Sequence, residues 1–181
     1  EMYGSDLPKA DVEVISLAYS FLRNAGLKDL AVNINSIGCK ECRLAYNKAL
    51  KEYIGANLDD MCPTCKSRFD KNPLRILDCK EEKCKLITAQ APKIIDYLCD
   101  DCREHFHEVQ NGLTALGIPF AVNPGIVRGL DYYTRTVFEF ISTDIGAQGT
   151  VCGGGRYNHL VEEVGGKPTP AAGFGLGLER L

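Results

Sequence analysis

Cysteine spacing gives the strongest chemical signal in the sequence. Eight of the nine cysteines form four close pairs, Cys39/Cys42, Cys62/Cys65, Cys79/Cys84 and Cys99/Cys102. Two thiolates on one tight turn can bind the same metal ion, and two such pairs complete a tetrahedral zinc site. Ligation by four sulfurs selects zinc or iron–sulfur chemistry. The spacing therefore predicts two closed four-cysteine sites, with Zn²⁺ as the preferred ion.

The four pairs can combine in three ways, and spacing alone does not choose among them. We favour a nested arrangement, because the short inner loop costs less chain entropy to close. In it, Cys62/Cys65 joins Cys79/Cys84, and Cys39/Cys42 joins Cys99/Cys102. A site closed by four cysteines has no open position for a substrate, so its role would be structural. Reduced, unliganded thiols are the alternative, whereas a disulfide framework is disfavoured in a chain with no secretory signal.

A second group of reactive side chains lies in RGLDYYTRTVFEF, residues 128–140. The guanidinium of Arg128 is a rigid fork of donors that can hold a phosphate or a carboxylate. Tyr132 and Tyr133 would point to opposite faces of an extended chain. The β-branched and aromatic residues that follow predict a strand over 135–142. Taken alone, the fragment is more simply a surface ion pair of Arg128 with Asp131 beside half-buried tyrosines.

Three successive glycines form the third candidate feature. Gly153, Gly154 and Gly155 remove every Cβ where a ligand could approach the backbone, and Tyr157 follows them closely. Their spacing matches neither a dinucleotide-binding nor a P-loop fingerprint. For an isolated run of glycines, a bend at the end of a strand is the alternative.

The elements that position these residues predict an α+β fold in two parts. Residues 1–37 and 118–181 would form a core, and residues 38–117, which hold all eight paired cysteines, a small and mostly helical insertion. Because so small a unit cannot bury a large core, bound metal ions are a physically reasonable source of its stability. Helices are expected over 7–25 (with Asp6 as N-cap), 44–54, 83–88, 103–116 and from Glu179, and strands over 31–38, 74–77, 118–123 and 135–142.

Composition narrows the class of protein. The 181 residues are 45% hydrophobic and 25% charged, as in soluble globular proteins, and no apolar run reaches the roughly 18 residues of a membrane span. The net charge of −3 does not decide for or against a nucleic-acid partner. Residues 66–85 carry seven basic against four acidic side chains, which fits either a local basic face or a solvated surface. Because the chain begins with Glu1, we expect a piece of a longer protein.

Three stretches together resemble the histidyl-tRNA synthetase family. RGLDYYTRTVFEF, GGGRYNHLVEEVGG and GFGLGLERL resemble its two histidine-specific motifs and its third class motif, in the same order and spacing. NSIG, NPLRILD and APKIIDYL are similar to its insertion domain. The resemblance implies a class II catalytic core, an antiparallel sheet flanked by helices, with an insertion over the acceptor end of tRNA. It also implies a cytoplasmic, homodimeric ligase that uses histidine, ATP with Mg²⁺ and tRNA(His), and forms histidyl-adenylate.

The resemblance also assigns roles to single residues. It implies that Arg128 is the catalytic arginine on the α-phosphate of ATP and the histidine carboxylate, and that Arg180 binds ATP. Tyr133 and Tyr157 would place hydroxyls at the imidazole, and Gly153, Gly154 and Gly155 would floor the pocket. Glu1 would contact histidine, with a frayed terminus as the alternative. The family's usual GGRYD-G is GGRYNH here, with Asn158 and His159, but Tyr157 is kept.

Several parts of the family pattern are absent from this chain. It has neither the first class motif, which forms the dimer interface, nor the arginine of the second motif, nor the anticodon-binding domain. We therefore expect the isolated chain not to activate histidine. Two alternatives stand beside the ligase: a regulatory paralogue that serves histidine biosynthesis, which the intact arginines and tyrosines disfavour, and a zinc-stapled RNA-binding module.

Overall fold

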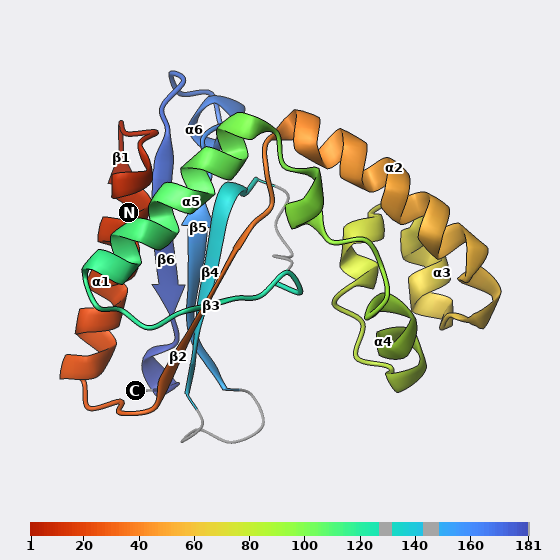
Figure 1. Ribbon diagram of the computed structural model, residues 1–181, viewed down its shortest axis with the longest axis horizontal. Helices are drawn as coiled ribbons and strands as arrows, with labels where there is room; N and C mark the ends of the chain where they lie inside the picture. The colour runs from red at the N-terminus through yellow and green to blue at the C-terminus, as the bar shows by residue number, and fades with distance from the viewer. Residues whose placement is uncertain (127–131, 143–148, 181) are drawn as a thin grey trace.

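A mostly antiparallel sheet forms the centre of the molecule (Figure 1). The computed structural model describes residues 1–126, 132–142 and 149–180. Within these ranges the sheet has the order β1-β6-β5-β4-β2-β3, and only the β2–β3 pair is parallel. The α+β class and the antiparallel sheet are therefore confirmed. The strands are β1 (Met2–Tyr3), β2 (Leu30–Ser36), β3 (Ala121–Val122), β4 (Thr134–Ser142), β5 (Thr150–Arg156) and β6 (Ala171–Leu176).

Two long helices, α1 (Pro8–Asn24) and α5 (Asp100–Ala115), cross one face of the sheet (Figure 1). Each buries one apolar stripe, because residues three and four apart share a helix face. A Cβ on Gly112 would lie 2.6 Å from Cγ2 of Val12, so this glycine lets the two helices approach closely. The core beneath them includes Val14, Ile15, Ala18, Leu22, Val32, Ile34, Phe106, Val109, Leu113, Phe138 and Phe140.

The start of α1 differs by one residue from the sequence prediction. Leu7, and not Asp6, is the N-cap. Its backbone is extended, and its apolar side chain accepts no hydrogen bond from the first turn of the helix. Pro8 occupies the first turn, where a missing N–H costs nothing. Gly26, with a φ of +104°, follows the helix end, as its position in the sequence predicts.

The cysteine-rich segment folds into a lobe beside the sheet (Figure 1). It has its own core, which includes Tyr46, Leu50, Ile54, Met61, Ile76 and Ile94. The expected strand over 74–77 is wrong, because Pro73 starts a 3₁₀ turn there, and so short an apolar run does not distinguish strand from helix. The lobe contains α2 (Lys40–Ala56), η1 (Leu58–Asp60), α3 (Pro63–Phe69), η2 (Pro73–Ile76), α4 (Glu82–Thr88) and η3 (Ile94–Tyr97).

Helix α5 lies inside the range 38–117 that the sequence assigned to the insertion, yet its Phe106, Val109 and Leu113 pack in the sheet core. We therefore propose that the insertion ends near Cys99 and that α5 belongs structurally with the sheet. The remaining elements, α6 (Leu160–Glu163) and η5 (Leu178–Arg180), follow β5 and β6. None of the helices that the structure describes is long and apolar enough to cross a membrane.

Candidate ligand site and two cysteine clusters

Glycines leave a bare patch on the sheet face opposite the two helices. Gly155 of β5 and Gly173 of β6 are register partners, so both point to the same side of the sheet. A Cβ on Gly155 would lie 3.0 Å from Cδ1 of Tyr133, and one on Gly173 would overlap the carboxylate of Glu1. Tyr133 and Glu1 therefore lie on the same face, on either side of the glycine backbone.

The triple glycine contributes two residues to this patch and one to the core. Gly153 pairs with Gly175, and strand alternation places both on the same face as Gly155. A Cβ on Gly175 would meet nothing within 4 Å, so the patch is open there. Gly154 corrects the expectation that all three glycines floor a pocket. A Cβ on it would point to the helix-covered face, 2.7 Å from Cζ of Phe138, so it serves core packing.

Three tyrosines form a cluster beside the glycine patch. The ring centroids of Tyr132 and Tyr133 are 4.7 Å apart, and that of Tyr157 lies 5.9 and 6.4 Å from them, edge-on to both. Tyr157 is buried, and its backbone N–H donates to the carbonyl of Ala171 at 2.8 Å, which fixes the end of β5 against β6. Tyrosine combines an apolar ring with a hydroxyl that both donates and accepts, so this cluster suits a small planar polar ligand.

Two predicted site residues lie beyond what the structure describes. Arg128 falls in the segment 127–131, outside the described residues. The backbone of Arg180 ends η5, but its side chain is also outside the described part of the chain. The roles that the resemblance implies for both arginines stay predictions.

A buried charged network, which the sequence analysis did not find, supports the site from behind. The carboxylate of Asp11 on α1 accepts from Nη2 and Nε of Arg156 at 2.6 and 3.0 Å, and lies 3.1 Å from Nε2 of His105. All three side chains are at most 4% exposed. Nη1 of Arg135 donates to Nδ1 of His105 at 2.9 Å, so the ring proton of the histidine is on Nε2 and faces Asp11.

The network fixes the strand that carries the pocket residues. Arg156 stands between Gly155 and Tyr157, and it also donates to the backbone carbonyls of Ser5 and Leu7. One guanidinium thus joins the end of β5 to the segment that leads into α1. A signal was present in the sequence: Asp11 occupies the buried stripe of α1, and an acid on an apolar helix face calls for a buried partner.

The eight paired cysteines form two clusters, each with all four Sγ atoms within 4.8 Å of one another. The outer cluster contains Cys39, Cys42, Cys99 and Cys102, and the inner cluster contains Cys62, Cys65, Cys79 and Cys84. The nested pairing is therefore confirmed. Sulfur–sulfur distances are 3.5 and 4.0 Å in the outer cluster and 3.8 Å in the inner one. Four sulfurs about 2.3 Å from a tetrahedral zinc ion would be spaced by about 3.8 Å, so each cluster fits one such ion.

Backbone hydrogen bonds at helix N-termini and burial shift the pKa values of several of these thiols in opposite directions. Cys39 and Cys62 directly precede α2 and α3. The backbone N–H of Cys65 donates to Sγ of Cys62 and lowers the pKa of that thiol to about 7. Burial raises the pKa of Cys39, but hydrogen bonds, chiefly from the backbone of Cys42, outweigh it and bring the pKa to about 7. Burial raises the pKa of Cys65 and of Cys102.

Comparisons with known proteins identify the family of the chain. The profile of the histidyl-tRNA synthetase family matches residues 73–181. The chain belongs to the histidyl-tRNA synthetase family. It is 58% identical over its full length to the histidine–tRNA ligase of Acetivibrio thermocellus and 57% identical to that of Caldanaerobacter subterraneus. It spans 43% of the length of each of these curated relatives.

Solved synthetases share the fold. Apo histidyl-tRNA synthetase from S. aureus superposes with a TM-score of 0.78 at 37% identity, over 98% of this chain and 43% of that one. A Bacillus halodurans protein, described as an ATP phosphoribosyltransferase regulatory subunit/histidyl-tRNA synthetase, superposes with a TM-score of 0.60 over 97% of this chain and 49% of that one. At 22% identity the second likeness shows the fold alone.

The effect of added side-chain volume on the glycine patch can be tested by substitution. We expect Gly155→Ala to lower the free energy of unfolding by about 1–3 kcal/mol, because the new Cβ would lie 2.6 Å from the carbonyl oxygen of Thr136. Gly175→Ala is the matched control on the same face, and it should be neutral or stabilise by up to about 1 kcal/mol. Urea unfolding of both variants measures the difference, and equal effects would contradict the packing described here.

Proposed function

We propose that this chain forms the histidine-binding part of a histidine–tRNA ligase. The enzyme would activate histidine with ATP and Mg²⁺ to histidyl-adenylate and then transfer the histidyl group to tRNA(His). The observation that carries the proposal is the placement of Glu1 and Tyr133 on either side of the glycine patch, on the sheet face that the helices leave uncovered. A flat floor with polar groups at its rim suits a small amino acid.

The chemistry of each side chain matches one part of the substrate. The hydroxyls of Tyr133 and Tyr157 would bond the imidazole nitrogens, and the carboxylate of Glu1 would pair with a positively charged group of histidine. An amino acid without ring nitrogens would leave buried hydroxyls unpaired, which is costly and therefore discriminating. Arg128 would stabilise charge on the α-phosphate, and Arg180 would hold ATP, since a guanidinium fork does so without changing its protonation.

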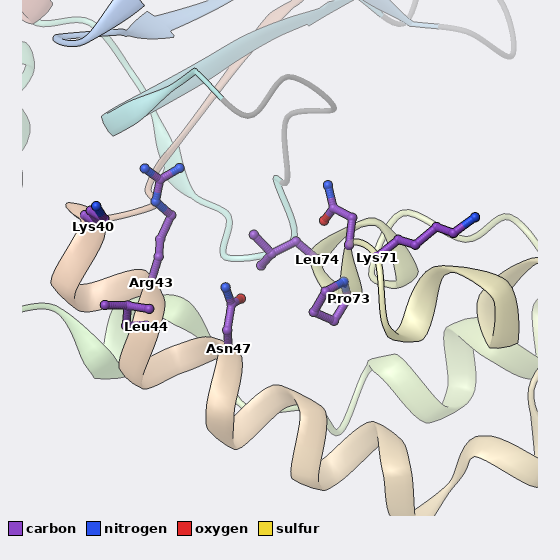
Figure 2. Close-up of a pocket in the computed structure, with 8 residues that line it drawn as sticks. Lys40, Arg43, Leu44, Asn47, Lys71, Pro73 and Leu74 are labelled. Carbon is purple, nitrogen blue, oxygen red and sulfur yellow. The ribbon is translucent and has the colours of Figure 1, made fainter. Parts of the chain in front are cut away.

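A basic pocket supports tRNA as the second substrate (Figure 2). It lies between α2 and the η2 region, and its lining includes Lys40, Arg43 and Lys71, with Asn47 between them. Figure 2 shows Lys40, Arg43 and Asn47 on α2 at one side of the pocket, and Pro73 and Leu74 at the other. Cationic side chains bind the phosphates of nucleic acids regardless of sequence. We propose that the acceptor end of tRNA(His) contacts this pocket.

The proposal also includes bound zinc, and the oligomeric state and cellular compartment of the full-length enzyme. Each cysteine cluster would hold one Zn²⁺, because four thiols at these spacings match tetrahedral ligation. Bound zinc would cross-link the lobe and take no part in the reaction, since four cysteines leave no open position. The full-length enzyme would act as a homodimer in the cytoplasm.

The direct test places this chain in an enzyme of the relatives' length. Residues 1–181 would replace the matching segment of the Acetivibrio thermocellus ligase, and histidine-dependent exchange between ATP and pyrophosphate would be measured. We expect the hybrid to be active and Tyr133→Phe or Tyr157→Phe to raise KM for histidine about tenfold, the worth of one hydrogen bond. KM for ATP should be unchanged. Tyr19→Phe on α1, behind the sheet, is the control and should leave both KM values unchanged.

Other outcomes separate the alternatives. A hybrid that folds without exchange activity, but binds histidine, would favour a regulatory paralogue. RNA binding that weakens steeply with salt, in a hybrid that neither binds nor activates histidine, would favour an RNA-binding module. Exchange by the isolated 181-residue chain would contradict the expectation that it needs further segments.

A further inference from the structure

The outer cysteine cluster lies where the chain crosses between the sheet and the lobe. The first crossing leaves β2 and enters α2 through Gly38 and Cys39, and the second returns through Leu98 into α5. Gly38 has a φ of +65°, and a Cβ on it would lie 3.0 Å from Sγ of Cys42 and 3.1 Å from Cδ2 of Leu98. The backbone N–H of Cys99 donates to Sγ of Cys42 at 3.2 Å. The two crossings are therefore packed against each other at the cluster.

Residues adjacent to Cys39 and Cys42 form hydrogen bonds with the backbone of residues 133–135, the segment that carries Tyr133. Arg43, next to Cys42, donates from Nη1 to the carbonyl of Tyr133 at 3.2 Å, and Figure 2 shows it reaching from α2 toward the start of β4. The carbonyl of Gly38 accepts from the backbone N–H of Arg135 at 2.9 Å, and the N–H of Ile37 donates to the carbonyl of Arg135 at 2.8 Å. Three hydrogen bonds thus tie this crossing to residues 133–135.

The second crossing holds the same segment through a side chain. Arg135 forms an ion pair with Asp101, which precedes Cys102, and donates to His105 one turn further along α5. The backbone of Arg135 has a φ of +52°, a left-handed conformation that non-glycine residues rarely adopt. Such a conformation persists only where the surrounding structure enforces it. Here, groups next to both halves of the outer cluster enforce it.

The inner cluster has different neighbours. Cys62 donates from its backbone N–H to Sγ of Cys84, Lys83 forms an ion pair with Asp60, and Lys66 donates to the carbonyl of Asp59. These contacts join the short helices of the lobe to one another.

We propose that zinc in the outer cluster positions Tyr133 in the histidine pocket, and that zinc in the inner cluster serves only the lobe. The link to histidine rests on the function proposed above, whereas the link from the outer cluster to residues 133–135 rests on the contacts alone. Outer-site zinc would fix the two crossings relative to each other, and Arg43, Gly38 and Asp101 would transmit that geometry to the start of β4. Arg43 and Arg135 are positioning residues in this scheme.

Matched serine variants of the 181-residue chain provide the test. Cys39→Ser and Cys62→Ser each remove the half-buried first thiol of one cluster, directly before a helix. Elemental analysis should find two zinc ions per chain in the parent and one in each variant. We expect Cys39→Ser to raise amide hydrogen exchange over residues 132–137 about tenfold, and Cys62→Ser to leave it unchanged while exchange rises over α3 and α4. The proposal would be overturned if hydrogen exchange over residues 132–137 rose equally in both variants, or if it did not rise in Cys39→Ser.

A second variant keeps all the cysteines, so it tests the proposal even if Cys39→Ser misfolds. Arg43→Ala should retain two zinc ions and still raise exchange over residues 132–137, with partial rescue by Arg43→Lys, which restores a donor. Lys40→Ala, on the same helix turn, should change neither. Retained protection in Arg43→Ala would count against the proposed transmission.

Added L-histidine separates this proposal from the proposed function. In the zinc-loaded chain, histidine should slow exchange over residues 132–137, and it should do so less in Arg43→Ala. Zinc-dependent protection with no effect of histidine would support the positioning link and count against the histidine site. Loss of zinc dependence would overturn the link whatever histidine does.

Discussion

Replacing Asp11 by alanine is expected to lower the free energy of unfolding by about 3–5 kcal/mol, because the guanidinium of Arg156 would stay buried without a counter-charge. The carboxylate of Asp11 also accepts from His105, so the substitution removes partners from two buried groups on different elements. Urea unfolding followed by circular dichroism measures the loss as a shift of the midpoint at constant slope.

Glu13 offers a control on the same helix. It is exposed, and Glu13→Ala should change the free energy of unfolding by no more than about 0.5 kcal/mol. The loss of unfolding free energy in Asp11→Asn should lie between those of Asp11→Ala and Glu13→Ala, because an amide can still accept hydrogen bonds but carries no charge. A loss below about 1 kcal/mol in Asp11→Ala would mean that Arg156 finds solvent or another partner, and would contradict its burial.

Features governed by local spacing could be predicted from the sequence. The nested cysteine pairing followed from loop entropy, since the inner cluster closes over residues 62–84 and the outer one encloses it. The long helices followed from apolar residues recurring three and four apart, as in Val14, Ala18 and Leu22 of α1. Residues 135–142 form most of β4 as predicted, because β-branched and aromatic side chains suit a pleated surface.

Features that depend on distant partners could not be predicted in this way. Asp11 meets His105 and Arg156 across 94 and 145 positions of sequence, and no local pattern encodes such a match. The position of Glu1 over Gly173 arises because β1 pairs with β6, which brings the first residues of the chain to the last strand. Most of residues 74–77 lie in a 3₁₀ turn and not in the expected strand, because a strand needs a hydrogen-bonded neighbour and none of the strands that the structure describes lies in the lobe.

Removing metal from the zinc-loaded chain is expected to unfold the lobe and to leave the sheet core folded. Structural zinc in small domains contributes about 10–16 kcal/mol of apparent binding free energy at neutral pH, which exceeds the stability that so small a core supplies. Both clusters place buried cysteines in or beside the packed residues of the lobe, so removing the ion would remove the cross-link that holds its short helices together. Hydrogen exchange with excess chelator should show α2, α3 and α4 losing protection before α1.

Cys152 separates metal loss from general thiol damage. It is buried in the sheet core and belongs to neither cluster, so Cys152→Ser should keep two zinc ions and the same response to chelator.

The order in which α5 loses protection is the decisive observation, because α5 begins at the outer cluster but buries Val109 and Leu113 against α1 and the sheet. The first turn of α5 should therefore lose protection with the lobe, while its later turns persist. Simultaneous loss along the whole of α5 would mean that the zinc sites stabilise the sheet core as well, and equal protection with and without chelator would mean that helix packing alone holds the lobe.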